Sequence, residues 1–236
     1  MIEDRLLPTE TGQPGPAPTP PLVVAVLLSG SGRTLENLLA SIAAGTLAVK
    51  IAVVMSSVPA VRGLEIAAAA GIPTQVIRRR DFDDDAVYSD AIYAALAPYA
   101  PSLILLAGFL RRLLVPPAWR GRILNTHPAL LPESGVAGRG MFGARIHAAV
   151  LARGGTRSGA TVHVVDDGYD TGPVVRRMEV PIAPGDSAES LGARVFAAEC
   201  LLYPAAIRDY VASHPELFGD AAAAQAANGD LGRGTR

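Results

Sequence analysis

Short apolar runs alternate with helical periodicity through the first half of the chain, and this alternation limits the fold more than any other feature. The runs with the length and composition of buried strands are residues 22–28, 50–55, 74–77 and 103–106. The segments that predict helices between them are residues 35–44, 63–70 and 83–97. Strands that alternate with helices form mostly parallel sheets with right-handed crossovers. The sequence therefore predicts an α/β fold, a Rossmann-like sheet flanked by helices.

The second half of the chain arranges its predicted elements differently. A strand ending near residues 123–124 precedes a helix at about 144–152, and strands at 160–165 and 174–180 precede a long helix at 187–213. This order predicts mixed strand directions in the C-terminal half of the sheet. We expect one domain over residues 22–213, with a disordered Pro-rich leader at 1–21 and a disordered Ala/Gly-rich tail at 214–236.

Composition and charge exclude several classes of partner. The 236 residues are 50% hydrophobic and 18% charged, which suffices for a substantial core. A net charge of −1 argues against nucleic-acid or anionic-membrane partners, so an anionic ligand must meet a local site. The single cysteine, Cys200, excludes an intrachain disulfide and fits a reducing compartment. No apolar run is expected to be long enough to span a bilayer and no secretory signal is recognisable, so we expect a cytoplasmic protein without membrane partners.

The segment 125–132 has the character of an active-site loop. Asn-Thr-His-Pro at 125–128 follows an apolar strand, and a second proline ends the segment at Pro132. In open α/β sheets ligands bind where strands end, so Asn125 and His127 are expected at such an edge. Period-two geometry places both side chains on the same side of an extended segment, where an amide and an imidazole can address one atom.

A glycine-rich loop, Ser-Gly-Ser-Gly-Arg-Thr at 29–34, joins the first predicted strand to the first predicted helix. Backbone N–H groups and a helix N-terminus there would favour an anion. The third glycine of the dinucleotide fingerprint is replaced by Leu35, and the Gly-Lys-Ser/Thr of a phosphate loop is absent. We therefore interpret the loop as a monophosphate site; the alternative is a tight turn without a ligand.

The acidic segment Asp-Asp-Gly-Tyr-Asp-Thr-Gly-Pro at 166–173 directly follows a predicted strand. One interpretation is a solvated turn between two strands. The other is that one of its carboxylates faces His127, stabilises the imidazolium and raises its pKa, which would tune an acid catalyst.

Taken in order, these motifs resemble the phosphoribosylglycinamide formyltransferase family, the folate-dependent glycinamide ribonucleotide transformylases of purine synthesis. The resemblance spans residues 22–210 and adds Ala-Gly-Phe at 107–109, Ala-Thr-Val-His at 160–163, and Glu199 with Tyr-Pro at 203–204. The Asn-x-His-Pro signature is shared with the wider group that uses 10-formyltetrahydrofolate. Methionyl-tRNA formyltransferases and formyltetrahydrofolate deformylases carry a further domain, for which we expect this chain to have no room. The resemblance thus implies glycinamide ribonucleotide as the acceptor.

The resemblance also implies roles for individual residues. The implied catalytic residues are Asn125, His127 and Asp170. The implied acceptor-binding residues are Gly30, Ser31, Gly32, Arg33 and Glu199. The residues implied to line the folate pocket, largely through their backbones, are Leu110, Arg111, Arg112, Leu113, Asn125, Val165, Asp166, Asp167, Gly168 and Tyr169. Asp83-Asp84-Asp85 stands where relatives often carry an arginine near the folate, and the glycine-rich segment 133–142 is expected to be a mobile lid or a long flexible loop.

The other histidines and Cys200 are interpreted as structural. His163 and His147 lie in apolar strand and helix contexts, and Cys200 lies in an apolar helical run. No metal-binding spacing is present, and no metal is expected to be required.

The sequence therefore predicts an enzyme that transfers the formyl group of 10-formyltetrahydrofolate to the amino group of glycinamide ribonucleotide, as a monomer or homodimer. Two alternatives stay open. One is a 10-formyltetrahydrofolate hydrolase, which would pass the formyl group to water; the other is a noncatalytic folate- or nucleotide-binding module.

Overall fold

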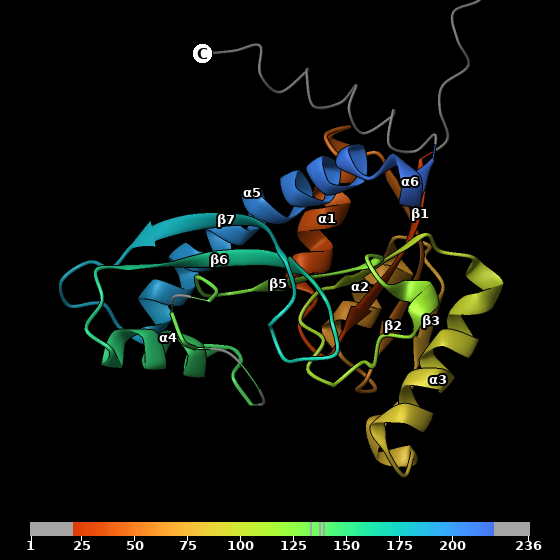
Figure 1. The fold of residues 1–236 in the computed structure, drawn as a ribbon, viewed down its shortest axis with the longest axis horizontal. Helices are drawn as coiled ribbons and strands as arrows, with labels where there is room; N and C mark the ends of the chain where they lie inside the picture. The colour runs from red at the N-terminus through yellow and green to blue at the C-terminus, as the bar shows by residue number, and fades with distance from the viewer. Residues whose placement is uncertain (1–20, 133, 137, 139, 220–236) are drawn as a thin grey trace, which may run out of the picture.

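The computed structural model describes residues 21–219 except residues 133, 137 and 139. A seven-stranded sheet in the order β3-β2-β1-β4-β5-β6-β7 forms its centre (Figure 1). Most of the predicted leader and of the predicted tail lies outside the described residues.

The first five strands are parallel, as the alternation of apolar runs predicts. β1 pairs with β2 and β4, β2 pairs with β3, and β4 pairs with β5. The elements of this half are β1 (Leu22–Leu28), α1 (Arg33–Ala43), β2 (Val49–Ser56), α2 (Arg62–Ala69), β3 (Thr74–Val76), α3 (Asp85–Leu96), β4 (Leu103–Leu106) and β5 (Ile123–His127). Three short 3-10 helices join them, η1 (Arg79–Asp81), η2 (Ala97–Tyr99) and η3 (Pro117–Trp119).

The last two strands reverse direction. β6 is antiparallel to β5, and β7 is antiparallel to β6. The elements of this half are α4 (Ala144–Ala152), β6 (Arg157–Val164), β7 (Val174–Pro181), α5 (Ala188–Ser213) and α6 (Pro215–Phe218). The mostly parallel α/β sheet with mixed directions in its C-terminal half is thus confirmed.

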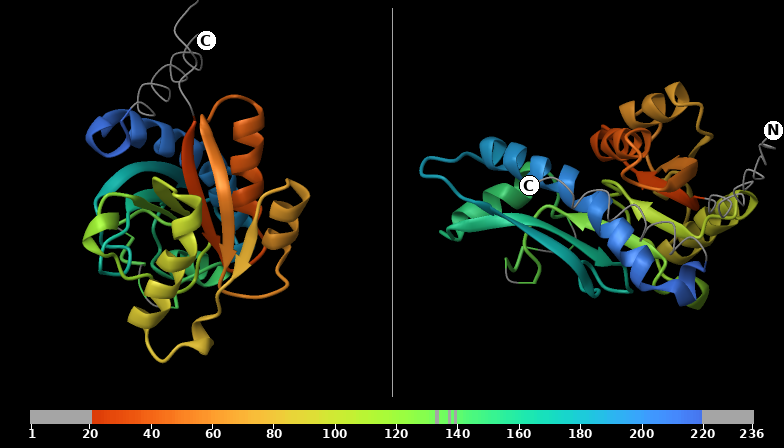
Figure 2. Two further views of the ribbon diagram at one scale, coloured as in Figure 1. Left: turned by 90° about the vertical axis from the view of Figure 1, so that its right-hand side faces the viewer. Right: turned by 90° about the horizontal axis from the view of Figure 1, so that it is seen from above.

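Helices cover both faces of the sheet because its central strands are apolar on both sides (Figure 2). In β1, Val24, Val26 and Leu28 belong to the larger core cluster with residues of α1, α4 and α5. Ala25 and Leu27 belong to the second cluster, with residues of α3. The alternation of successive β1 side chains therefore divides the core into two layers.

Two boundaries differ from the predictions, and the first of them lies at the cavity described below. β5 continues through His127, so Asn125 and His127 are strand residues and not the start of a loop. The reason is β6, whose antiparallel partnership extends β5 beyond its apolar part. At the other end of the domain, α6 lies within the predicted tail, and its Phe218 is buried against the larger core cluster.

The long helix α5 corrects the expectation that no segment could span a bilayer. By length and composition alone, its 26 residues would suffice to cross a membrane. In the structure, one side of α5 is buried against the sheet through residues such as Leu202, Tyr203 and Ile207. The Tyr203 hydroxyl donates to backbone carbonyls of both β4 and β5, at 3.2 Å from Leu106 O and 3.0 Å from Leu124 O. These contacts are those of a core helix.

Candidate active site

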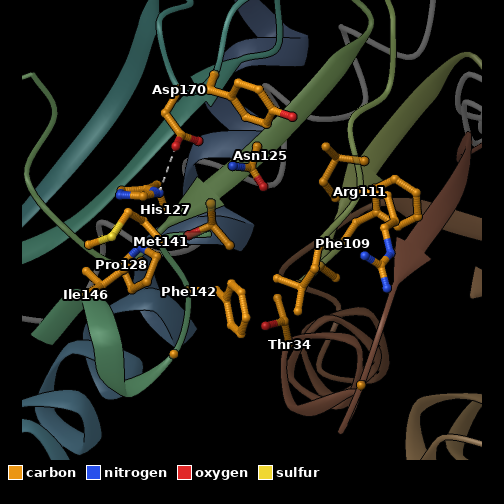
Figure 3. Close-up of a pocket in the computed structure, with 18 of the residues that line it drawn as sticks. Thr34, Phe109, Arg111, Asn125, His127, Pro128, Met141, Phe142, Ile146 and Asp170 are labelled. Carbon is orange, nitrogen blue, oxygen red and sulfur yellow. Dashed lines mark ion pairs between the residues drawn. The ribbon is translucent and has the colours of Figure 1, made fainter. Parts of the chain in front are cut away.

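A cavity of about 660 Å³ opens at the carboxyl ends of β1, β4 and β5. Its walls are the loop after β1, the segment 106–113 after β4, the end of β5, and the turn between β6 and β7. Residues from the predicted lid, including Met141 and Phe142, line it as well, and Figure 3 shows Phe142 across the cavity from Arg111. The predicted location of the site at the strand ends is the location of this cavity.

Four side chains from three segments meet on one wall of the cavity. Asn125 and His127 come from β5, His163 from β6, and Asp170 from the turn that follows β6. The Asp170 carboxylate lies 3.5 Å from His127 Nδ1 through one oxygen and 3.5 Å from His163 Nε2 through the other. Figure 3 shows His127 and Asp170 pointing toward each other beside Asn125. The sequence-predicted trio is therefore brought together, with a histidine that was not predicted to take part.

His163 was interpreted as structural, and this interpretation misses its contacts. Its Nδ1 lies 3.0 Å from Val164 O, and its Nε2 lies 3.1 Å from the side-chain nitrogen of Asn125. With Nδ1–H donating to the carbonyl, Nε2 accepts from the Asn125 amide. The antiparallel register places Asn125 opposite His163. The only sequence signal for this role was the Ala-Thr-Val-His motif that ends at His163.

The environment of His127 differs from the predicted one. The side chain is only 4% exposed, and its Nε2 donates to Val136 O at 2.8 Å. Burial lowers the pKa of His127, and the nearby Asp170 carboxylate offsets this only in part. The expected rise in the pKa of His127 is therefore wrong, because desolvation of the charged ring outweighs a carboxylate at 3.5 Å.

Asp170 is held in its position by backbone and side-chain contacts. Its backbone adopts a left-handed conformation with φ of 56°, and its Oδ2 accepts from Gly138 N at 3.1 Å. Burial raises the pKa of Asp170, but its contacts with His163 and His127 and the hydrogen bond from the Gly138 N–H together hold the pKa below its ordinary value. The carboxylate is therefore the charged member of the cluster at neutral pH.

The predicted anion loop lies at another part of the cavity wall. Gly30, Ser31, Gly32, Arg33 and Thr34 all line the cavity, and α1 begins directly after Gly32. Gly32 has φ of 73°, and a Cβ there would collide with the Cα of Gly63. The loop is thus packed against the start of α2, where Gly63 N donates to Gly30 O at 3.1 Å. Only glycine fits this position without strain.

Glu199 of α5 reaches the same part of the cavity. Its Oε1 accepts from the Thr126 hydroxyl at 3.1 Å, so β5 contributes a further polar contact between Asn125 and His127. Burial raises the pKa of Glu199 to about 7, against the opposing effects of Thr126 and Arg33. The Arg33 guanidinium carbon lies 3.6 Å from the ring centroid of Phe196, one turn earlier on α5. Neither Thr126 nor Phe196 was predicted as a site residue.

The predicted folate residues divide into two groups. Those that line the cavity are Leu110, Arg111, Arg112, Leu113, Asn125, Val165, Gly168 and Tyr169. Asp166 and Asp167 do not line it, and border a second cavity on the other side of the same turn. Asp166 accepts from Gly168 N at 3.0 Å and from the Thr171 hydroxyl at 2.8 Å, so its carboxylate shapes the turn. The Asp167 backbone carbonyl accepts from Arg112 at 2.9 Å.

The acidic run 83–85 also has a structural account. Asp84 caps α3 by accepting from Ala86 N and Val87 N. Asp85 lines the cavity and pairs with Arg79, a cation that the sequence analysis did not single out, at 2.5 Å. An arginine is therefore present on this wall, supplied by η1 instead of α3.

Comparison with known proteins agrees with this geometry. Residues 22–207 match the model of the formyl transferase family. The chain belongs to the formyl transferase family. It is 34% identical over 188 residues to a phosphoribosylglycinamide formyltransferase of Escherichia coli, covering 78% of this chain and 84% of that protein. A solved phosphoribosylglycinamide formyltransferase from Brucella melitensis superposes with a TM-score of 0.70 at 39% identity, covering 80% of this chain and 95% of the other.

This formyl transferase is also similar to part of a much larger protein. It is 42% identical over 189 residues to the trifunctional purine biosynthetic protein adenosine-3 of Drosophila pseudoobscura pseudoobscura. That match covers 78% of this chain but only 13% of the larger protein. The likeness therefore concerns one portion of that protein.

Proposed function

We propose that this formyl transferase moves the formyl group of 10-formyltetrahydrofolate to the amino group of glycinamide ribonucleotide. The observation that carries the proposal is one cavity that joins Asn125, His127 and Asp170 to an anion-binding loop. The relatives named phosphoribosylglycinamide formyltransferase support the same acceptor.

The wall formed by Asn125, His127, His163 and Asp170, which we call the catalytic wall, suits attack by an amine on a formyl carbon. As the amine adds, the formyl oxygen gains negative charge, which the Asn125 amide stabilises as a hydrogen-bond donor. The amine nitrogen must lose a proton and the folate nitrogen must gain one as it leaves. His127 carries protons in this scheme, and the Asp170 carboxylate stabilises its ring whenever the ring is charged.

The low pKa of His127 defines its resting role. In the structure described, the ring is predominantly neutral at pH 7, and its Nε2 proton is bonded to Val136 O. For Nε2 to exchange a proton with the substrates, this bond must be replaced by a bond to substrate. The segment around Val136, part of the predicted lid, therefore moves or His127 rotates as the substrates bind.

The acceptor occupies the end of the cavity next to α1. The backbone N–H groups of residues 30–34 and the N-terminus of α1 receive the phosphate, together with the Arg33 side chain. Glu199 meets the sugar hydroxyls or the amino group, because a carboxylate accepts from both. With a pKa of about 7, Glu199 is only partly ionised at neutral pH, and a substrate ammonium would draw it toward the charged form.

The donor occupies the end formed by the segment 110–113 and the turn around Gly168 and Tyr169. Backbone groups of these segments read the edge of the pterin ring. Arg111 lines the same cavity and suits the carboxylates at the far end of a folate. Arg79 lines this wall as well, but it is paired with Asp85. A cytoplasmic location and a monomeric or dimeric state are parts of the proposal that rest on the sequence alone.

The deciding experiment measures the loss of formyl from 10-formyltetrahydrofolate by absorbance, with and without glycinamide ribonucleotide. We expect turnover that depends on the ribonucleotide. Equal turnover in its absence would replace the proposal with a hydrolase. No turnover in either case, with both ligands bound, would replace it with a binding module.

A further inference from the structure

One contact in the cavity joins residues far apart in sequence and has no role in the chemistry described above. The Arg33 guanidinium carbon lies 3.6 Å from the centroid of the Phe196 ring, a stacking distance. Arg33 is the first residue of α1, and Phe196 lies within α5. Both side chains line the cavity at its acceptor end.

The charge of Arg33 is available to a ligand. Among the residues that the structure describes, Arg33 forms no ion pair. The other arginine at this loop, Arg62, donates to both carboxylate oxygens of Glu36, at 2.9 and 3.1 Å, and to Ser31 O at 3.3 Å. Arg62 is thus ion-paired with an acidic side chain. Arg33 is instead held over an aromatic ring, and its charge acts on the nearby Glu199 carboxylate without forming an ion pair with it.

Phe196 also differs from the apolar residues that hold α5 in place. Its ring is only partly buried, and among the described residues it belongs to neither core cluster. Its neighbour in the chain, Val195, is fully buried in the larger cluster. The ring therefore packs mainly on Arg33 and the cavity, and its removal leaves the helix anchored.

An exposed arginine loses much rotamer entropy when it binds an anion, and stacking on a ring removes part of that loss in advance. We infer that Phe196 is a positioning residue for phosphate recognition: it holds the Arg33 guanidinium over the acceptor end of the cavity, where it meets the phosphate of the ribonucleotide. This inference rests on the proposed function and deepens it, because it assigns a residue that positions the Arg33 side chain for the acceptor's phosphate.

The test compares Phe196→Leu, which keeps an apolar side chain without a ring, with Phe196→Tyr, which restores the ring. Leu201→Ala is the matched control on α5, since Leu201 is 69% exposed. With the folate saturating, we expect Phe196→Leu to raise KM for glycinamide ribonucleotide about 3- to 10-fold with kcat almost unchanged, as for the loss of one cation–π contact. Phe196→Tyr and Leu201→Ala are expected to stay within about 2-fold of wild type.

Two further measurements separate positioning from a general structural role. In an Arg33→Met background, Phe196→Leu should raise KM no further, because the ring then has no guanidinium to hold. With glycinamide riboside, which lacks the phosphate, Phe196→Leu and wild type should have the same kcat/KM. An effect of Phe196→Leu that persists with Arg33→Met or with the riboside would overturn the inference, as would an unchanged KM for the ribonucleotide.

Failure of the positioning role of Phe196 can be distinguished from failure of the proposed function. If the wild-type protein shows no turnover that depends on the ribonucleotide, the proposed function fails. Binding of ribose 5-phosphate is then measured by calorimetry on wild type and Phe196→Leu. Weaker binding by the variant supports the positioning role at an anion site, and equal binding or no binding refutes it.

Discussion

The acceptor end and the catalytic wall of the cavity are built by different means. The acceptor end depends on one short loop whose shape comes from backbone conformation, with Gly32 in a left-handed conformation and packed on Gly63. The catalytic wall depends on side chains from β5, β6 and the turn after β6, which meet only in the folded sheet. The acceptor end can therefore be damaged by a single methyl group, whereas the catalytic wall can lose a functional group and keep its fold.

Burial also shifts the pKa values of these two parts of the cavity in opposite directions. It lowers the pKa of His127 and raises that of Glu199, because in each case the charged form is desolvated. His127 therefore rests as a neutral base. Glu199 is protonated in a larger fraction of molecules than an ordinary glutamate at the same pH. The difference predicts opposite responses of stability to pH, which mutations at each end can isolate.

The largest expected effect is at the catalytic wall. Asp170→Asn removes the charge that stabilises the His127 ring, and we expect kcat to fall about 10²–10³-fold, or roughly 3–4 kcal/mol in the barrier. Circular dichroism and thermal melting should show a folded protein. Asp167→Asn is the control, because the Asp167 side chain lies in the same turn but does not line this cavity. Near-native turnover by folded Asp170→Asn would contradict the proposed pairing.

A methyl group at the acceptor end should act mainly on the fold. Gly32→Ala combines a left-handed backbone with a collision against Gly63 Cα, and we expect a loss of about 2–4 kcal/mol in the free energy of unfolding. Gly45→Ala is the matched control, with φ of 71° but no heavy atom within 4 Å of the new methyl group, and should cost only about 1 kcal/mol. Equal losses in denaturant titrations would mean that packing on α2 does not constrain the loop.

Glu199→Gln should separate stability from activity at the acceptor end. A folded pKa of about 7 against 4.5 means that the folded state holds the proton more tightly, so the wild type loses stability as pH rises between these values. At pH 8 the variant should be more stable by about 1–3 kcal/mol, yet have a raised KM for the ribonucleotide. The stability difference should shrink below pH 4.5. Glu189→Gln, at an exposed position on the same helix, is the control for the loss of one carboxylate from α5.

His127→Gln should show the opposite sign with a smaller effect. Because the folded pKa of His127 lies below its ordinary 6.5, the unfolded chain binds the proton first as pH falls. Wild-type stability is therefore complete above about pH 6.5 and declines below it, by at most about 1.4 kcal/mol per pH unit for this group. The variant should decline less steeply, while His147, whose pKa burial also lowers, keeps part of the slope. A slope unchanged by the substitution would show that His127 is less buried than described.

The sequence was informative where function follows from neighbouring residues. The loop at 29–34 and the segment 125–128 could be located because strand ends and turn residues mark them locally. The partners His163 and Phe196 could not, because register and helix packing bring them to the site over long sequence separations. Val136 is only 9 residues from His127, but its backbone contact depends on the path of the intervening loop, which no local motif marks. The direction of the shift in the pKa of His127 was missed for a related reason. A nearby carboxylate can be inferred from sequence, but the depth at which the ring is buried cannot.

Because the site depends on the register between β5 and β6, enzymatic activity also reports on correct strand pairing. Asn125 lies opposite His163 and His127 opposite Thr161, and a slip of one residue would turn His163 to the other face of the sheet. A misregistered molecule would keep most of its secondary structure but could not assemble the cluster. Specific activity after refolding therefore counts the correctly paired molecules, a quantity to which far-ultraviolet spectra are almost blind.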